Sequence, residues 1–142
     1  MRTKLAVVVV GLGLFMVPAA APVWAHHAFS AEFDAAKHMV FTGTVTKMEW
    51  VNPHVWIHVD VKKPDGTVEN WAVEAGTPSA LYRRGLTKAA VPAGVEIAID
   101  GYGAKDGSYR MNGRDLKFAD GRAFFLGSSG TGAPDEKAAP AK

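Results

Sequence analysis

The residues best suited to chemistry in this chain are its histidines, which are unevenly distributed. All five precede residue 59, and they are His26, His27, His38, His54 and His58. Imidazole is a common ligand for transition metals in proteins, so this clustering suggests a metal site. The chain has no cysteine and no His-Glu-x-x-His pattern, so the suggestion rests on the histidines alone.

The start of the chain gives His26 a special role. Arg2 and Lys4 precede an apolar stretch, residues 5–17, that is shorter than the roughly 20 residues needed to cross a membrane. A short apolar segment behind a positive start, followed by Val23 and Ala25 at the two positions that a signal peptidase reads, is typical of a cleavable signal peptide. We therefore expect a signal peptide over residues 1–25 and a mature protein in the periplasm or outside the cell, without a stable membrane anchor. An uncleaved anchor is the alternative.

Cleavage after Ala25 would give His26 a free α-amine beside its own imidazole. These two nitrogens form a chelate, and one further imidazole, from His54 or His58, would complete a three-nitrogen site. Such ligands suit copper(II), nickel and zinc, and copper binds most tightly to a given nitrogen site. We predict a metal site from His26, His27, His54 and His58, with copper as the cofactor. The alternative is that these histidines are solvated or hydrogen-bond to a turn.

A second candidate surface surrounds the pentad Asn52-Pro53-His54-Val55-Trp56. Strict alternation from His54 places Trp56, His54 and His58 on one face of a strand, away from its apolar face. An outward tryptophan beside polar groups favours contact with a ligand. The competing hypothesis is an interaction module without metal, which binds a peptide, a glycan or a partner protein. Its candidate residues are Asn52, Trp56, Glu74, Arg83 and Arg84.

Net charge and composition limit the classes of partner that the mature protein is expected to bind. Removing residues 1–25 takes away Arg2 and Lys4, so the basic count falls from 16 to 14, equals the 14 acidic residues, and the net charge falls from +2 to 0. A neutral domain lacks the positive surface that attracts phosphate backbones, so we do not expect nucleic-acid binding. The expected partners are a metal ion or a periplasmic protein. No local pattern predicts a catalytic residue, and an oxidative copper enzyme is the third, weaker hypothesis.

The elements that must position these residues are mostly strands. Alternating and β-branched segments predict strands, Pro64-Asp65-Gly66 predicts a hairpin turn, and Thr77-Pro78 with Gly85 predicts the ends of a short helix. Glu74, at a strand end, could pair with Arg83 or Arg84. The predicted strands cover residues 39–50, 54–61, 67–74, 95–102, 109–118 and 123–126, and the helix covers residues 79–84.

The order of these elements predicts a mainly β protein. Three strands, a helix and two or three further strands match a five- to six-stranded OB-like barrel with one short helix between strands 3 and 4. A small open sandwich is the alternative. We expect a single domain over residues 26–126, because the small residues, prolines and charges of residues 127–142 predict a disordered tail.

The mature sequence resembles a family of small exported bacterial proteins grouped as a domain of unknown function, family 6152. The segments that carry the resemblance are His26-His27-Ala28-Phe29, Gly43-Thr44-Val45, Trp50, Asn52-Pro53-His54, Trp56-Ile57, Trp71-Ala72-Val73-Glu74, Leu81, Arg83-Arg84-Gly85, Gly101-Tyr102, Lys105-Asp106-Gly107 and Asp120-Gly121-Arg122. The resemblance implies export and a compact domain, and no established activity. Ala28 replaces the serine of the family's His-His-Ser start, which leaves the metal hypothesis unaffected, because neither side chain is a strong ligand.

Overall fold

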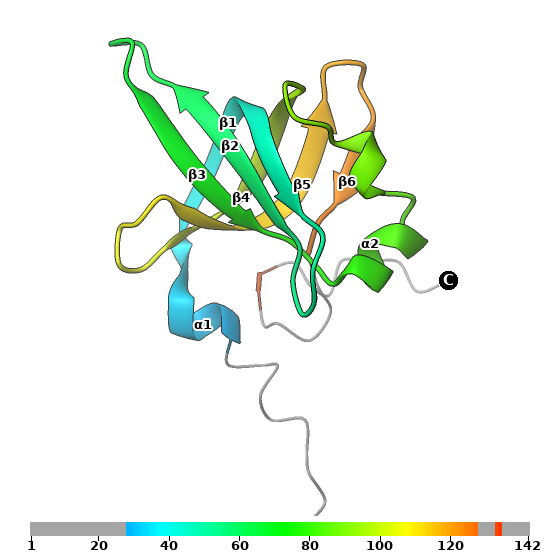
Figure 1. Ribbon diagram of the computed structural model, residues 1–142. Coiled ribbons are helices and arrows are strands. Elements are labelled where there is room, and N and C mark those ends of the chain that lie inside the picture. The colour runs from blue at the N-terminus through cyan, green and yellow to red at the C-terminus, as the bar shows by residue number, and fades with distance from the viewer. Residues whose placement is uncertain (1–27, 128–132, 135–142) are drawn as a thin grey trace, which may run out of the picture.

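The computed structural model describes residues 28–127 and 133–134, so the predicted signal peptide, His26 and His27 lie outside the described residues. Strands dominate, and two short helices and one 3-10 turn accompany them (Figure 1). In chain order the elements are α1 (Ala28–Glu32), β1 (Phe33–Glu49), β2 (Trp56–Lys62), β3 (Val68–Glu74), α2 (Pro78–Arg83), η1 (Lys88–Ala90), β4 (Glu96–Ala104), β5 (Arg110–Phe118) and β6 (Ala123–Phe125).

The strands close into a ring. β1 pairs antiparallel with both β2 and β4. On the other edges of these two strands, β3 pairs with β2 and β5 pairs with β4, again antiparallel. A short parallel pairing of β3 with β5 joins the two ends of this order, and β6 lies beside β5. With α2 between β3 and β4, the arrangement is an OB-like barrel, which confirms the predicted fold class.

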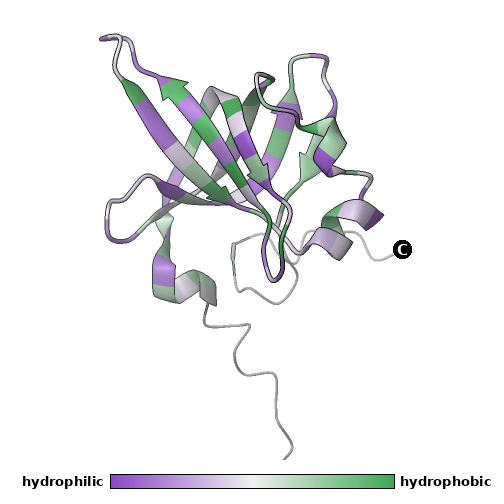
Figure 2. Ribbon diagram, in the orientation of Figure 1, coloured by the Kyte–Doolittle hydropathy of each residue, from purple (hydrophilic) through white to green (hydrophobic). Residues whose placement is uncertain are grey.

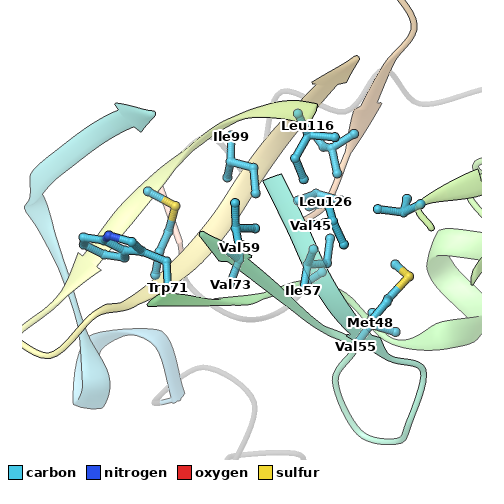
Figure 3. Packing of buried hydrophobic residues seen from close by; sticks show 14 of the residues in the cluster. Val45, Met48, Val55, Ile57, Val59, Trp71, Val73, Ile99, Leu116 and Leu126 are labelled. Carbon is cyan, nitrogen blue, oxygen red and sulfur yellow. The ribbon is translucent and has the colours of Figure 1, made fainter. Parts of the chain in front are cut away.

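The alternation in β2 explains how the barrel is filled. Ile57, Val59 and Val61 are buried in the core, whereas Trp56 and His58 on the other face are only half-buried. The colours of Figure 2 alternate along β2 and β3 for this reason. Figure 3 shows Ile57 and Val59 among core residues from other parts of the chain, which include Val45, Val73, Ile99, Leu116 and Leu126.

β1 is longer than predicted, because it begins at Phe33 and not at residue 39. Its early part is held by pairing with β4, a contact between distant parts of the chain that alternation alone does not reveal. Gly43 lies where β1 approaches β2 closely: a Cβ there would sit 2.5 Å from Cγ1 of Val59 and 2.6 Å from the carbonyl oxygen of Asp60. Only glycine fits this position without displacing its neighbours.

The predicted turn and helix ends are confirmed. The Thr77 side chain accepts a hydrogen bond from the Ala80 amide at the start of α2, and Gly85 has a φ of 85° just after its end. The Asp65 side chain accepts a hydrogen bond from the amide of Thr67, two residues later in the hairpin turn. These local interactions are of the kind that favour asparagine, aspartate, threonine and glycine at turns.

The helix α1 was not predicted. It is held by a small second core, in which Phe29 is buried against Phe33 and lies edge-on to Tyr102 with 5.6 Å between ring centroids. Lys105 also donates from its backbone amide to the carbonyl oxygen of Glu32 over 2.9 Å. Ala133 packs against the same cluster. These contacts fix α1 against the turn that joins β4 to β5.

Candidate functional site

A pocket of about 370 Å³ opens where α1, the loop between β1 and β2, and the ends of three strands meet. In Figure 1 this loop and α1 both lie at the lower end of the barrel. The strand register explains the convergence, because Trp56 pairs with Glu74 across β2 and β3, and Ala72 pairs with Arg110 across β3 and β5. The lining residues are Glu32, Val51, Asn52, Pro53, His54, Trp56, Glu74 and Arg110.

His54 and Glu74 form the central contact of this pocket. Nδ1 of His54 contacts Oε1 of Glu74, and the two side chains are 24% and 10% exposed. If Nδ1 carries the proton and donates it to the carboxylate, Nε2 keeps its lone pair. Histidines that bind metals are usually held in this way, with the second ring nitrogen bonded to a carboxylate or carbonyl. The contact with Glu74 therefore gives His54 the orientation that a metal ligand would need.

Arg110 also lines the pocket and contacts residues from three elements. Its Nη2 lies 2.6 Å from Oε2 of Glu32, and its guanidinium lies 5.4 Å from the Trp56 ring centroid and 5.8 Å from that of Phe33. Stacking on two aromatic rings is a favourable environment for a guanidinium, and it leaves Trp56 half-buried. Trp56 thus shares its pocket with a cation, an acid and His54.

Comparison with models of known protein families shows which family the chain resembles. Residues 14–113 match the family model described as "Family of unknown function (DUF6152)". The chain belongs to this family. No curated protein matches the sequence. Within the part of the DUF6152 chain that the structure describes, neither helix has the length and apolar character needed to cross a membrane.

The electrostatics of this DUF6152 pocket centre on Glu74. Burial raises the pKa of the Glu74 carboxyl above its ordinary value of 4.5, and the negative charge of Glu32 acts in the same direction. Interaction with His54 and the positive charge of Arg110 oppose this increase without cancelling it. Ionised Glu74 is therefore costly to bury, and a positive charge bound next to it would offset that cost.

Glu74→Gln tests this account through the pH dependence of stability. A carboxyl whose pKa is raised in the folded protein favours folding at low pH, and this contribution is lost as the pH rises from 4.5 through the raised value. We expect Glu74→Gln to be more stable than the wild type by on the order of 1 kcal/mol at pH 7, and the gain to vanish near pH 4. Urea denaturation from pH 4 to 7 measures the difference.

The control for this comparison is Glu96→Gln, which removes the same charge from an exposed position at the start of β4. Its difference from the wild type should not grow between pH 4 and 7. A gain that is constant over this range in Glu74→Gln would show that burial of the charge is not the cause.

The other described histidines of this DUF6152 member lie elsewhere. Nε2 of His58, on β2, lies 3.3 Å from Oε1 of Glu49, whereas Nδ1 of His54 contacts Glu74. His38 pairs through Nε2 with Oδ1 of Asp100 at 2.7 Å. His54 and His58 thus contact different carboxylates. Of the two alternatives for the third nitrogen, only His54 lines the pocket.

The described residues alone do not form a metal site. Residues 28–127 and 133–134 contain no group of three or more histidine, aspartate or glutamate side chains able to hold a metal ion. Any ion at His54 would need ligands from outside this part of the chain. The predicted ligands His26 and His27 lie there, immediately before α1.

The remaining candidate residues of the interaction hypothesis lie in different parts of the structure. Asn52 lines the pocket and precedes a cis peptide bond to Pro53. Arg84 holds β6, because its Nη1 donates to the carbonyl oxygens of Phe125 and Gly127 at 3.3 and 2.5 Å. Burial lowers the pKa of Arg84, and the charge of its neighbour Arg83 lowers it further.

Glu74 thus pairs with His54 and not with Arg83 or Arg84. Arg83 is exposed at the end of α2 and does not line the pocket. Sequence reasoning did not identify two residues of the pocket, Glu32 and Arg110. Glu32 lies on the unpredicted helix α1, and Arg110 reaches the pocket only through the pairing of β3 with β5.

Proposed function

We propose that this protein is a small exported binding protein that holds a transition-metal ion, with copper preferred, between its mature N-terminus and His54. Cleavage after Ala25 would supply the α-amine and the imidazole of His26, with His27 as a further donor, in the periplasm or outside the cell. His54 would supply the third nitrogen through Nε2. The preference for copper follows from the general affinity order of divalent ions for nitrogen sites.

The contact between His54 and Glu74 carries this proposal. A buried carboxylate that accepts from Nδ1 fixes the orientation of the ring and leaves Nε2 available to a metal ion, as it does in many metal proteins. A bound cation would in turn favour the ionised form of Glu74, whose burial is otherwise costly. Both effects favour a cation beside His54.

The chain connectivity supports the remaining ligands. Glu32, at the end of α1, lines the pocket, and the five residues of α1 rise only about 7.5 Å along a helix axis. His27 is bonded directly to the first of them, Ala28. Because α1 is fixed by Phe29 and Glu32, the covalent chain limits how far the predicted terminal ligands can be from His54.

His54→Ala tests the proposal on mature protein whose start at His26 has been verified by intact mass. We expect copper(II) affinity to fall at least about 100-fold, because a first ligand should matter at least as much as the outer-shell partners whose loss costs about 10- to 100-fold. Calorimetric titration measures the affinity, and electron paramagnetic resonance counts the bound nitrogens, which should decrease by one.

Two matched substitutions control this experiment. His38→Ala removes another imidazole paired with a carboxylate, and His58→Ala removes the alternative third ligand. Both should bind copper(II) as the wild type does. A wild type that binds more weakly than about 10 μM, short of the roughly −8 kcal/mol of a micromolar site, would contradict the metal proposal.

The second candidate function is an interaction module that binds a peptide, glycan or partner protein without metal. It is favoured by the pocket itself, whose volume of about 370 Å³ and mixture of Trp56, Asn52 and Arg110 suit a small organic group. Its key side chain would be Trp56. Failure of copper binding in the wild type, together with a Trp56-dependent ligand, would favour this function.

A further inference from the structure

We propose that the pocket holds the end of a neutral glycan, with one sugar ring against Trp56. This inference rests on the second candidate function and names its ligand class, and it does not require a bound metal. Three features of the pocket support it. They are the pairing of its charged side chains, the polar groups around Trp56, and the strand pairing that leaves no free edge for a peptide.

The charged side chains that line the pocket are already paired with one another. Nη2 of Arg110 lies 2.6 Å from Oε2 of Glu32, and Nδ1 of His54 contacts Oε1 of Glu74. A charged ligand must compete with Arg110 or Glu32 for its partner, and an organic cation has little access to Glu74, whose side chain is 10% exposed. A hydroxyl group both donates and accepts hydrogen bonds, so it can bind beside either pair without separating it. The pocket therefore favours a neutral ligand rich in hydroxyl groups.

Trp56 gives this polar pocket an aromatic surface. Its side chain is half-buried, and the guanidinium of Arg110 lies 5.4 Å from its ring centroid. A sugar ring carries C–H groups on one face and hydroxyl groups around its rim, so the face can pack on an aromatic ring while the rim hydrogen-bonds to polar side chains. Asn52 and Glu32 also line the pocket, and both are exposed. The pocket thus offers a suitable surface to each part of a sugar ring.

The strands at the pocket offer no free edge to a peptide. Trp56 pairs with Glu49 on β1 and with Glu74 on β3, and Glu74 pairs on its other side with Asn112 on β5. A peptide bound by strand addition needs an unpaired edge, whereas proline-rich and helical peptides need aromatic-lined or hydrophobic grooves. Of the eight described residues that line the pocket, four are instead ionisable. The lining therefore suits a glycan better than a peptide.

The size of the pocket suits a terminal sugar. Its volume of about 370 Å³ is near the lower end of the roughly 300–1,000 Å³ that is typical of small-ligand sites. Further sugars of a longer glycan would extend along the outer face of β2 and β3, which continues from Trp56 to Asp60 and its partner Asn70. A short oligosaccharide is therefore the appropriate probe.

The test uses hexasaccharides of three charge types on metal-free mature protein. Cellohexaose and chitohexaose are neutral, the chitosan hexamer is positively charged, and cellohexaose with its primary alcohols oxidised to carboxylates is negatively charged. We expect at least one neutral hexamer to bind with a Kd below about 1 mM, and at least about tenfold more tightly than either charged hexamer. Calorimetric titration measures the affinities, and the indole signal of Trp56 in nuclear magnetic resonance spectra should shift on binding.

Substitution of Trp56 tests the position of the sugar. Trp56→Ala should lower the affinity for the neutral hexamer at least about tenfold, and Trp56→Phe, which keeps an aromatic ring, should lower it less. Tyr82→Ala removes an aromatic side chain that is 69% exposed on α2, outside the pocket, and should bind as the wild type does. Circular dichroism verifies that each variant is folded.

Two further substitutions test the pairing of the charges. Arg110→Gln leaves Glu32 unpaired and should raise the affinity for the chitosan hexamer by about two- to fivefold. Glu32→Gln leaves Arg110 unpaired and should raise the affinity for oxidised cellohexaose by a similar factor. An unchanged order of preference in both variants would show that the ion pair does not exclude charged ligands.

The inference is overturned if neither neutral hexamer binds, or if the wild type prefers a charged hexamer. Neutral binding that Trp56→Ala does not weaken overturns the position of the sugar on this ring. These outcomes are independent of the copper titrations. Copper binding without glycan binding leaves the metal proposal intact and overturns this inference, whereas glycan binding without copper binding supports the second candidate function in its place.

Discussion

Ile57→Asp is expected to unfold the barrel. Ile57 is 0% exposed and lies among the core side chains of β1 and β3, so the new carboxylate would be buried without a partner. Such burial costs several kcal/mol, a large part of the roughly 5–15 kcal/mol by which small domains are stable. Circular dichroism and urea denaturation at pH 7 should show a largely unfolded protein.

Two further substitutions test whether the destabilisation depends on which face of the strand is changed. Val68→Asp places the same charge on β3, where Val68 is 53% exposed, and should cost less than about 1 kcal/mol. Trp56→Ala removes a larger side chain from the other face of β2 and should leave the protein folded. Equal destabilisation by Ile57→Asp and Trp56→Ala would mean that both faces of β2 are core.

Adding Gly-Pro before His26 is expected to lower copper(II) affinity by at least about 100-fold. The extension moves the free amine away from the His26 ring, and the proline nitrogen, which has no proton to lose, cannot replace that amine as a copper ligand. The thermal unfolding of the protein without added metal should not change. Calorimetric titration of the authentic and extended proteins, each verified by intact mass, measures the loss.

Gly-Pro added after Lys142 is the matched control for this extension, because it changes the length of the chain without touching the predicted chelate. In the authentic protein, affinity should also decrease as the pH falls from 7 to 5, because the nitrogen ligands must lose protons to bind metal. If the extended protein binds copper(II) as tightly as the authentic one, the mature N-terminus is not part of the site.

The sequence alone predicts the parts of the fold that depend on local patterns. The alternation around Ile57 fixes the core face of β2, and the Asp65-Gly66 turn fixes its partner strand. Counting outward from that turn places Trp56 opposite Glu74, so their proximity could also have been inferred. These features depend on residues that are close in the sequence.

Other parts of the site depend on contacts between distant segments. The five residues of α1 are too few to show a helical period, and they are held by packing of Phe29 on Tyr102. Arg110 reaches the pocket because β5 joins β3 at Ala72, a pairing for which the sequence carries no local signal. Glu32 and Arg110 were missed for these reasons, whereas His54 and Trp56 were found.

The parallel pairing of β3 with β5 links the pocket to the stability of the barrel. This seam spans only Ala72 to Glu74 on one strand and Arg110 to Asn112 on the other, and it is the join that closes the ring. Glu74 and Arg110 stand on its two sides. A ligand that binds to both residues would hold β3 and β5 together at this short pairing. Binding of the ligand would therefore oppose local opening of the ring, and opening of the ring would weaken binding.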